Sequence, residues 1–249
     1  MVDRAFSAPR LAALYDRLYP RSQGRDADFY LPLIREARAV LDVGCGTGAL
    51  LHEARRAGHA GRLCGLDPAE AMLAIARRRG DIEWVCGTLA SARWKSEFDL
   101  VVMTGHAFQA LVHDSEVRTA LAAIKSALRD AGRFVFETRH PAARAWERWA
   151  SAAPVEVLDE EGVIVRLTTR VDTPFDGRTV SFTETFTSAS WSEPQRSRST
   201  LRFLDADTLS GFLAEAGFRI GEQFGDWGRE PLGGASPEII TIACPGSAG

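Results

Sequence analysis

The apolar residues between positions 39 and 137 follow two alternating patterns. Short apolar runs predict buried strands at residues 39–43, 62–66, 82–85, 98–103 and 133–137. Apolar residues at helical spacing follow the first, second and fourth of these runs, at residues 49–57, 68–79 and 115–128. Strands that alternate with helices of this length form right-handed βαβ units around a parallel sheet. The pattern therefore predicts an α/β chain with a doubly wound sheet and helices on both faces.

A different pattern begins after residue 140. Apolar residues alternate with polar ones in 163–171 and in 180–186, and Asp176 and Gly177 lie between these two segments. An Asp-Gly pair between two alternating segments is a strong hairpin signal. A third candidate strand follows at 199–204. We expect an antiparallel sheet of three strands, inserted into the α/β unit as a lid or as a dimer surface.

Both ends of the chain extend the predicted α/β unit. Helical spacing precedes it at residues 9–19 and 26–38, and after the insertion the pattern predicts a helix at 205–216 and strands at 218–224 and 238–244. Asp205 is a suitable N-cap and Gly217 a suitable C-cap for that last helix. The expected organisation is an N-terminal helical cap at 1–38, a ligand-binding α/β core at 39–140, a β-rich lid or substrate region at 141–204, and the completion of the core at 205–249.

Composition narrows the class of protein. Of the 249 residues, 45% are hydrophobic and 25% are charged, which are ordinary values for a globular chain. The formal net charge of −3 argues against a large basic surface for nucleic acid, and no apolar segment is long enough to cross a membrane. The four cysteines are scattered without a Cys-x-x-Cys pair, which indicates reduced thiols rather than disulfides or a zinc site. We expect a cytoplasmic enzyme or small-molecule binder that holds no metal.

Residues 42–48 carry the strongest chemical signal in the chain. They read Asp-Val-Gly-Cys-Gly-Thr-Gly and connect the first predicted strand to its helix. Glycines at this place allow a sharp turn and a close approach of a ligand to the backbone. Asp67 ends the second predicted strand, where a carboxylate can accept hydrogen bonds from ribose hydroxyls. Both features lie at the switch point where doubly wound sheets bind their ligands.

The glycine spacing separates two kinds of nucleotide-like ligand. A dinucleotide-binding oxidoreductase is an alternative interpretation of this turn. Such enzymes carry G-x-G-x-x-G or G-x-G-x-x-A and bind a pyrophosphate at the helix N-terminus. In this chain the spacing is G-x-G-x-G, and Asp42 stands two residues before it. A carboxylate beside the turn suits a cationic amine better than a pyrophosphate. S-adenosylmethionine is such a ligand, because it joins an adenosine to an amino-acid tail and has a sulfonium but no phosphate.

Four segments resemble the motifs of class I S-adenosylmethionine-dependent methyltransferases. In chain order they are residues 42–48, Leu66-Asp67-Pro68, residues 98–102 and residues 128–134. The resemblance covers about residues 38–140, and the last helix and two strands at 205–244 fit the end of the family's fold. It implies a Rossmann-like seven-stranded sheet whose last strand is antiparallel. It also implies S-adenosyl-L-methionine as the cofactor and S-adenosyl-L-homocysteine as its product.

The same resemblance implies which residues hold the cofactor. The glycine turn would lie under the methionine tail with Asp42 near its amino group. Asp67 would accept from the ribose, and Met72 or Leu66 would pack on the adenine. Relatives often have Gly-Asp-Ala where this chain has Gly-Thr-Leu, so the Thr88 hydroxyl replaces a carboxylate, unless Thr88 is only a turn residue. The implied cofactor residues are Tyr15, Asp42, Gly44, Cys45, Gly46, Gly48, Asp67, Pro68, Met72, Gly87, Thr88, Leu89, Met103 and His106.

The candidate acceptor side follows the fourth and fifth predicted strands. His106 is the leading candidate for a general base because an imidazole titrates near neutral pH; a helix cap or pocket wall is its structural alternative. Tyr15 and Tyr19 resemble the N-terminal aromatic helix that closes over the cofactor in small-molecule methyltransferases. The candidate catalytic residues are His106, Gln109 and His140. The candidate substrate-binding residues are Tyr15, Tyr19, His106, Glu137, Arg139 and Trp191.

Three functions remain open on these observations. The leading one is a methyltransferase that moves a methyl group to an N, O or C atom of a small-molecule acceptor by in-line displacement. The first alternative keeps the cofactor but catalyses a cyclisation or rearrangement, since fold alone does not define chemistry. The second is a cofactor-binding partner subunit without catalysis. We expect a monomer, or a homodimer formed through the β insertion, with no nucleic-acid or membrane partner.

Overall fold

A seven-stranded sheet forms the centre of the computed structural model, which describes residues 2–20, 26–173 and 175–246. The strand order is β10-β11-β5-β4-β1-β2-β3. The strands are β1 (Ala39–Val43), β2 (Arg62–Asp67), β3 (Glu83–Cys86), β4 (Phe98–Met103), β5 (Leu128–Arg139), β10 (Phe218–Phe224) and β11 (Glu238–Pro245). Strand β11 pairs antiparallel with both β5 and β10, while β1 to β5 pair in parallel. The predicted seven-stranded sheet with an antiparallel last strand is confirmed.

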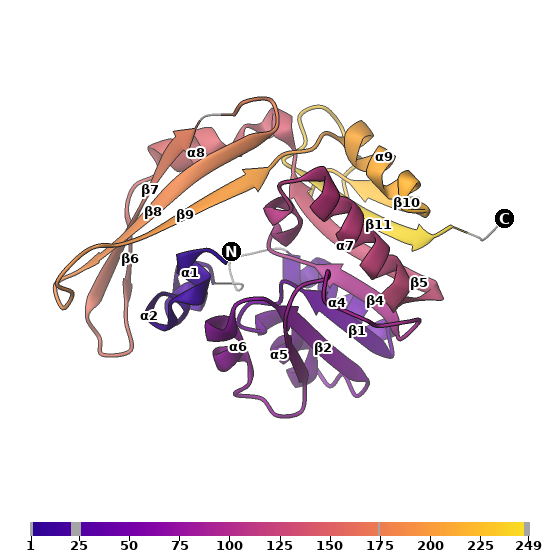
Figure 1. Ribbon diagram of the computed structural model, residues 1–249, viewed down its shortest axis with the longest axis horizontal. Coiled ribbons are helices and arrows are strands. Elements are labelled where there is room, and N and C mark those ends of the chain that lie inside the picture. Colours follow the sequence, from indigo (N-terminus) through magenta and orange to yellow (C-terminus); the bar gives the residue numbers. More distant parts are fainter. Residues whose placement is uncertain (1, 21–25, 174, 247–249) are drawn as a thin grey trace.

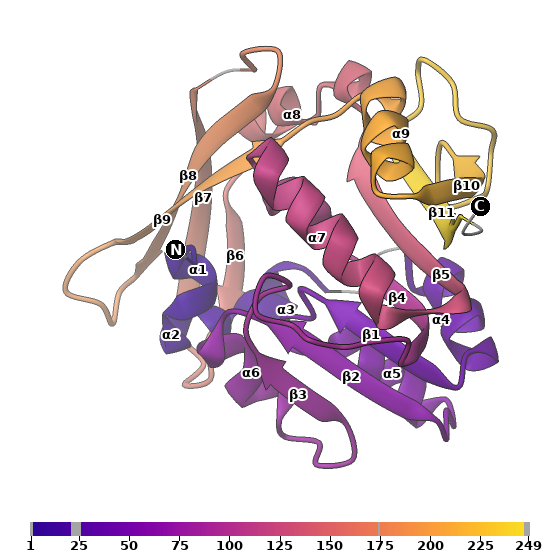
Figure 2. The same cartoon turned by 45° about the vertical axis from the view of Figure 1, so that its right-hand side comes forward.

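Helices cover both faces of this sheet, because alternate strand residues point to opposite sides. On one face, α4 (Asp26–Glu36) and α5 (Ala49–Arg56) pack on Val40, Val102 and Ile240. On the other face, α7 (Asp114–Ala127) and α9 (Ala206–Glu215) pack on Leu41, Phe134 and their neighbours. The short helix α6 (Glu70–Ala76) follows β2, and the 3₁₀ helix η2 (Ala107–Ala110) follows β4. Figure 2 shows α7 lying along the sheet.

Strand β5 differs from its prediction at its beginning. The strand was predicted at 133–137, but β5 begins at Leu128 and runs without a break from the end of α7. Its pairing with β4 shifts register between Phe98 and Leu100. A Cβ at Gly132 would lie 2.9 Å from the Arg129 carbonyl oxygen, so glycine allows a close backbone approach inside the strand. The glycine therefore marks an irregularity in a strand rather than a turn before one.

The N-terminal segment forms three short helices instead of the single helix predicted at 9–19. They are α1 (Arg4–Ser7), α2 (Pro9–Ala12) and α3 (Tyr15–Leu18). Neighbouring residues of this segment serve two different surfaces. Leu11 and Leu14 pack against Val165 and Leu167 of the inserted sheet, whereas Ala12 packs against Met72 of α6. Figure 1 shows α1 and α2 between the inserted sheet and α6.

The insertion forms a second, four-stranded antiparallel sheet in the order β6-β7-β8-β9. Its strands are β6 (Val155–Leu158), β7 (Ile164–Thr173), β8 (Thr179–Ser188) and β9 (Gln195–Arg202). The 3₁₀ helix η3 (Pro141–Ala143) and the helix α8 (Ala145–Ser151) lead into it. The three predicted strands are present, and the fourth, β6, is an addition that the alternation did not reveal.

One face of the inserted sheet is buried and the other is solvated. Along β7, Val165 and Leu167 are buried, and Ile164, Arg166 and Thr168, which alternate with them, are exposed. On β8, Phe186 packs against the N-terminal helices and Val180 against Trp146 of α8. The buried face therefore supports the N-terminal helices at one end and α8 at the other. We call this buried face the inner face of the inserted sheet.

Candidate active site

Three glycines shape the turn between β1 and α5. Gly44, Gly46 and Gly48 have φ of +73°, +54° and +75°, the left-handed region that other residues disfavour. The amides of Gly44 and Cys45 donate to the Leu66 carbonyl oxygen at 2.7 and 3.2 Å. These bonds tie the turn to the end of β2. The two strongest sequence motifs therefore meet at one edge of the sheet.

Two carboxylates stand beside this turn. Asp67 accepts from the Gly46 amide at 2.9 Å through one oxygen and from the Ala69 amide at 2.7 Å through the other. Burial raises the pKa of Asp67, although these two amides act in the opposite direction. Burial, followed by the carboxylates of Asp42 and Asp67, also raises the pKa of the Cys45 thiol. The turn is therefore lined by carboxylates, and burial among them favours the neutral thiol of its cysteine.

The space around the turn differs from one glycine to the next. A Cβ on Gly46 would meet nothing within 4 Å, whereas a Cβ on Gly48 would lie 2.3 Å from the ring of Trp84. A Cβ on Gly65, in β2, would lie 2.6 Å from the same ring. Trp84 thus fills one side of the turn, and the side at Gly46 stays open. This open side, with Asp42 and Asp67 beside it, fits a ligand that carries a cationic amine and ribose hydroxyls, as S-adenosylmethionine does.

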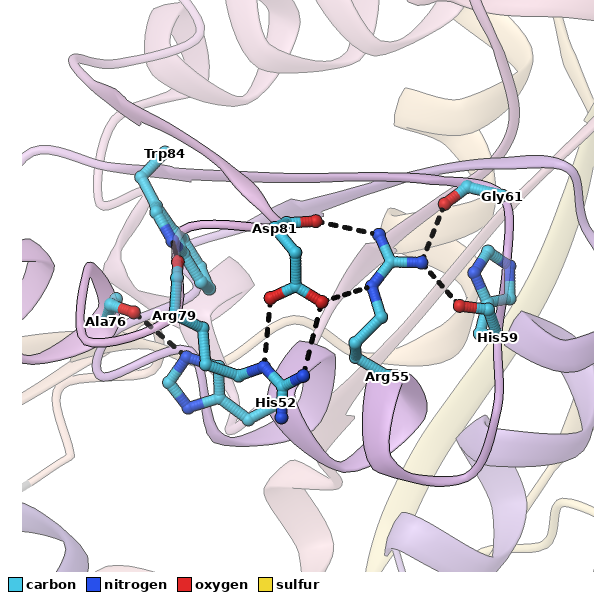
Figure 3. Close-up of polar contacts among 8 residues, drawn as sticks. All are labelled: His52, Arg55, His59, Gly61, Ala76, Arg79, Asp81 and Trp84. Atoms are coloured by element: carbon cyan, nitrogen blue, oxygen red, sulfur yellow. Dashed lines mark hydrogen bonds and ion pairs between the residues drawn. The ribbon is translucent and has the colours of Figure 1, made fainter.

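A polar network supports Trp84 from the neighbouring loops (Figure 3). The indole N–H donates to the Arg79 carbonyl oxygen at 3.1 Å, and the ring of His52 meets the indole edge-on at 5.4 Å. The Arg55 guanidinium donates to the Asp81 carbonyl oxygen at 2.9 Å and pairs with the Asp81 carboxylate at 3.2 Å. Helix α5 is thereby joined to the loop before β3. None of these side chains was a predicted site residue, and their role is to support the turn.

The residues expected beside the adenine are mostly buried in apolar clusters. Met72 is 2% exposed and packs on the N-terminal segment, while Leu89 and Met103 belong to the core cluster under α7 and α9. Thr88 is exposed, and its carbonyl oxygen accepts from the Ser91 hydroxyl at 2.8 Å. That bond is typical of a turn. Next to Pro68, the Gly87 amide donates to the Asp67 carbonyl oxygen at 3.1 Å, so the end of β3 also reaches Asp67.

His106 lies just after β4 and is held at two points. Its φ of +61° places it in the left-handed region, which is uncommon for a residue other than glycine. Its backbone amide donates to Glu137 Oε1 at 2.8 Å, and its ring Nε2 lies 3.0 Å from Glu238 Oε2. The candidate base is therefore set between carboxylates of β5 and β11.

Glu137 is a buried carboxylate with two donors. Besides the His106 amide, the hydroxyl of Tyr30 on α4 donates to its second oxygen. Burial raises the pKa of Glu137, against the lowering effects of His106 and Tyr30. The pKa of Tyr30 is also raised, by burial and by the negative charge of Glu137. Both oxygens of Glu137 accept protein donors, so the side chain links α4 to the loop after β4.

Gln109 and Arg139, two further candidates, bind each other. The side-chain oxygen of Gln109 accepts from Arg139 Nη1 at 3.0 Å, and its amide nitrogen donates to the Arg202 carbonyl oxygen at 2.8 Å. Gln109 is 1% exposed. The Arg139 guanidinium lies 5.1 Å from the centre of the Trp149 ring, and burial lowers its pKa. Gln109 thus joins β5 to the end of β9.

Two candidates lie in other surroundings. The imidazole Nδ1 of His140 accepts from the Ala142 amide at 3.1 Å and caps η3. Trp191, in the turn between β8 and β9, packs against the apolar cluster of the N-terminal helices, with the Arg10 guanidinium 5.0 Å from its ring centre. The contacts described for these two residues are with η3 and with the N-terminal helices rather than with His106.

The N-terminal tyrosines reach the inner face of the inserted sheet. The rings of Tyr15 and Tyr19 lie 5.2 Å apart. The Tyr19 hydroxyl donates to Glu184 Oε1 on β8 at 2.6 Å. Burial raises the pKa of Glu184, and the Tyr19 hydroxyl lowers it. In the same segment, Asp16 accepts from the Thr47 hydroxyl of the glycine turn at 2.7 Å, so the segment bridges the turn and the inserted sheet.

Three polar residues of this region were missed by the sequence reasoning. Glu238 begins the last strand, Tyr30 lies inside a helix, and Glu184 occupies an inner-face position of β8. Only Glu184 had a visible signal, because a carboxylate stood where the alternation of 180–186 expects an apolar residue. Tyr30 and Glu238 gave no such signal in the sequence, because their contacts with Glu137 and His106 depend on how α4 and β11 pack in the fold.

A surface depression of about 640 Å³ lies elsewhere, between α8 and the inserted sheet. Trp146, Val171 and Phe175 provide its apolar lining, and Arg144 and Glu147 its charged edge. It contains none of the candidate site residues.

Comparison with known proteins finds similarity to methyltransferases, which agrees with the geometry of the glycine turn. A family model described as "Methyltransferase domain" matches residues 40–132. A 2-phytyl-1,4-naphtoquinone methyltransferase from Thermosynechococcus vestitus is 35% identical over 153 residues, which cover 56% of this chain and 66% of that protein. The match therefore spans just under two thirds of that relative's length.

Solved structures resemble the chain over nearly its whole length. One is CalS10 from Micromonospora echinaspora, an amino pentose methyltransferase of calicheamicin biosynthesis whose structure contains S-adenosylmethionine. It is 27% identical to this chain with a TM-score of 0.67, and the match covers 93% of this chain and 96% of CalS10. The CcbJ methyltransferase from Streptomyces caelestis has a TM-score of 0.77 at 18% identity, over 99% of this chain and 100% of that one, and shows the shared fold.

The domain match, the sheet topology and the glycine turn agree with one another. They show that residues 40–132 form a methyltransferase domain and that the chain has the fold of S-adenosylmethionine-dependent methyltransferases. In residues 2–20, 26–173 and 175–246, no helix has the length and apolar character needed to span a membrane.

Proposed function

We propose that the protein transfers a methyl group from S-adenosylmethionine to a small-molecule acceptor. The observation that carries the proposal is the open side of the turn at Gly46, where Asp67 binds the turn and Asp42 lies beside it. A cationic amine and a ribose are the groups that such a site accommodates. The alternative, a dinucleotide, would place a pyrophosphate beside these two carboxylates, which is electrostatically unfavourable.

The cofactor supplies a methyl group that is activated by its attachment to a sulfonium. The backbone of residues 44–48 would hold the amino-acid tail, Asp67 the ribose, and the surroundings of Met72 and Leu89 the adenine. His106 would take a proton from the acceptor where the acceptor carries one. Tyr15, Tyr19 and the inner face of the inserted sheet would exclude water and align the acceptor.

The acceptor side favours a polar small molecule. Glu184 on the inserted sheet and Glu238 at the start of β11 are carboxylates near or within this region, and His106 and Arg139 lie beside Glu238. Carboxylates bind N–H and O–H donors. Methyl transfer to the N or O atom of a compact, donor-rich acceptor therefore fits these residues better than transfer to an apolar carbon centre. The amino pentose specificity named for CalS10 is an example of such chemistry in a relative.

Calorimetric titration tests the cofactor. We expect S-adenosylmethionine and S-adenosylhomocysteine to bind and NAD and NADP not to bind. Asp67→Ala should weaken binding of S-adenosylhomocysteine about 10- to 100-fold, because hydrogen bonds to a charged group contribute about 1.5–3 kcal/mol. Binding of the dinucleotides instead would overturn the proposal.

Asp99 provides a matched control for Asp67. It too accepts from two backbone amides, those of Arg38 and Ala39 at 3.0 and 2.9 Å, but at the opposite edge of the sheet. Asp99→Ala should therefore lose a comparable set of bonds and retain cofactor affinity.

An acceptor screen with labelled methyl donor then tests turnover. Transfer of label to an amine or alcohol in a panel of small polar compounds supports the proposal. Tight cofactor binding without transfer to any member, followed by an unlabelled rearranged product, would favour the cyclisation alternative. Tight binding without any turnover, together with activation of another enzyme on mixing, would favour the partner-subunit alternative.

A further inference from the structure

An imidazole and a carboxylate form a pair between the loop after β4 and the start of β11. His106 Nε2 lies 3.0 Å from Glu238 Oε2, and the two side chains are 19% and 14% exposed. Partial shielding from water strengthens such a bond relative to one on the open surface. The pair joins residues that are 132 positions apart, so it depends on the tertiary fold.

The backbone of His106 is held as firmly as its ring. The amide donates to Glu137, whose second oxygen accepts from the Tyr30 hydroxyl. The left-handed backbone at φ +61° is unfavourable for a residue other than glycine, and these bonds offset that cost. Such strain persists where the surrounding structure holds a side chain in one direction.

Strand pairing brings the two carboxylates to one face. In the register of β5 and β11, Glu137 is opposite Ile240 and Arg139 is opposite Glu238. Residues two apart in a strand share a face, so Glu137, Arg139 and Glu238 are neighbours. Arg139 interacts electrostatically with both glutamates. The charged and titratable groups close to the imidazole therefore include these two glutamates and this arginine, with Tyr30 bound to Glu137 and Tyr15 and Tyr19 near Arg139.

We propose that Glu238 is a positioning residue that sets the tautomer and direction of the His106 ring. The carboxylate accepts the Nε2–H, so Nδ1 keeps its lone pair. Within the part of the chain that the structure describes, Nδ1 has no hydrogen-bond partner. A carboxylate behind an imidazole both orients the ring and stabilises the imidazolium that forms when the other nitrogen takes a proton.

The proposal rests on the proposed methyl transfer and defines the chemistry of its acceptor. When the N–H or O–H bond of the acceptor breaks, its electron pair stays on the acceptor atom and its proton bonds to His106 Nδ1. The imidazolium then pairs with Glu238 and later returns the proton to solvent. The acceptor class is therefore an ammonium or hydroxyl compound that must lose a proton to react.

Nitrogen NMR of protein labelled at its histidines tests the pair without any acceptor. The chain has five histidines, and the spectrum of His106→Gln identifies the signals of His106. In the wild type we expect two widely separated ring resonances, one from a protonated Nε2 and one from an unprotonated Nδ1. In Glu238→Leu that separation should collapse towards the average of a ring that exchanges between tautomers.

A matched control is the exposed Glu222 on the neighbouring strand β10. Glu222→Leu should leave the His106 resonances unchanged. If Glu238→Leu does not fold, Glu238→Gln is used; its uncharged side chain should still shift the His106 resonances. Wild-type resonances of His106 in folded variants of Glu238 would overturn the proposal.

Calorimetry on the same samples separates this proposal from the proposed function. Unchanged binding of S-adenosylhomocysteine in Glu238→Leu, with an altered tautomer, supports the positioning role. Once an acceptor is known, His106→Gln and Glu238→Leu should each lower kcat about 100-fold, and the double variant should lose little more, because the two residues act as a unit. Normal kcat in Glu238→Leu would contradict the proposal even if methyl transfer is confirmed.

Discussion

The two sides of the candidate site are assembled differently. The cofactor side comes from one continuous stretch of chain, in which the turn at 44–48 and Asp67 follow adjacent strands and bind each other through backbone amides. The acceptor side gathers side chains from six separate elements or loops. They are Tyr19, Tyr30, His106, Glu137, Glu184 and Glu238. Backbone geometry defines the first side, and pairs of side chains define the second.

This difference predicts how each side responds to change. A turn held by glycines and backbone bonds has one conformation, so a substitution there disturbs the fold and the ligand site together. A pair such as Tyr19 and Glu184 joins the N-terminal segment to the inserted sheet, which other apolar contacts also hold together. Substitution of the pair alters the local opening of the site and leaves the sheet intact. The acceptor side is thus the part in which specificity can vary on a constant fold.

The largest effect is expected at Gly48. A Cβ there would overlap the Trp84 ring at 2.3 Å, on a backbone with φ +75°. Gly48→Ala should lower the free energy of unfolding by about 2–4 kcal/mol, through overpacking and backbone strain. Urea denaturation measures this change.

Gly46 is the matched comparison. Its φ is also positive, but a Cβ would meet nothing within 4 Å. Gly46→Ala should lower the free energy of unfolding by only about 1 kcal/mol. It should weaken the binding of S-adenosylhomocysteine at least as strongly as Asp67→Ala does, because the added methyl group enters the open side of the turn. Equal stability losses at the two glycines would contradict the assignment of a packed side and an open side.

Glu137 gives the second effect, which depends on pH. Burial raises its pKa above that of the unfolded chain. Its contribution to stability is therefore greatest below the unfolded pKa and is lost as the pH rises through the folded pKa. Glu137→Gln keeps an oxygen for the His106 amide but does not titrate. The free energy of unfolding of the variant should rise relative to wild type as the pH increases above the unfolded pKa of about 4.3, by about 1.4 kcal/mol for each unit by which burial raises the pKa.

Urea denaturation at a series of pH values measures the difference between the two proteins. Glu222→Gln, at an exposed position, should run parallel to wild type over the same range. A Glu137→Gln curve that also runs parallel to wild type would show that Glu137 has the same pKa in the folded and unfolded chain.

The elements of the central sheet were predictable because their signals are local. The strands at 98–103 and 218–224 match their predicted bounds, because the first is a largely apolar run and the second starts directly after the helix-ending Gly217. Strand β6 was missed because Val155 and Leu158 are exposed and the strand is a short edge. The single helix predicted at 9–19 was wrong, because the segment is divided into α2 and α3, and the periodicity within it gave no sign of that division.

The candidate site residues likewise divide into those that local sequence predicted and those that depend on the tertiary fold. The glycine turn and Asp67 were visible because a short stretch of sequence carries all the residues that meet. Glu238 was not, because its approach to His106 follows from the register in which β11 pairs with β5. Gln109 was visible as a polar residue after β4, but its bonds to Arg139 and to the Arg202 carbonyl depend on where β9 ends.

A smaller and more local effect is expected at Tyr19. Tyr19→Phe removes the donor to Glu184 at 2.6 Å, which joins the N-terminal segment to the inserted sheet. Loss of such a bond costs about 1 kcal/mol, so the amides of Leu18 and Tyr19 should exchange with solvent about 5-fold faster in hydrogen-exchange measurements. Amides of α7 should be unaffected. Faster exchange throughout the chain would show that the bond stabilises the whole fold.

The smallest effect concerns the bond that joins the two sides. The Thr47 hydroxyl donates to Asp16 at 2.7 Å, and it links the glycine turn to the segment that carries Tyr15 and Tyr19. Thr47→Val should weaken S-adenosylhomocysteine binding about 2- to 5-fold, through faster dissociation measured by stopped flow, because the segment is held less firmly beside the turn. Asp16→Asn should cause a similar or smaller change. If the two residues act only through each other, the double variant should bind S-adenosylhomocysteine no more weakly than Thr47→Val alone. Additive losses of affinity would mean that each residue affects the ligand separately. The two sides of the site would then be independent.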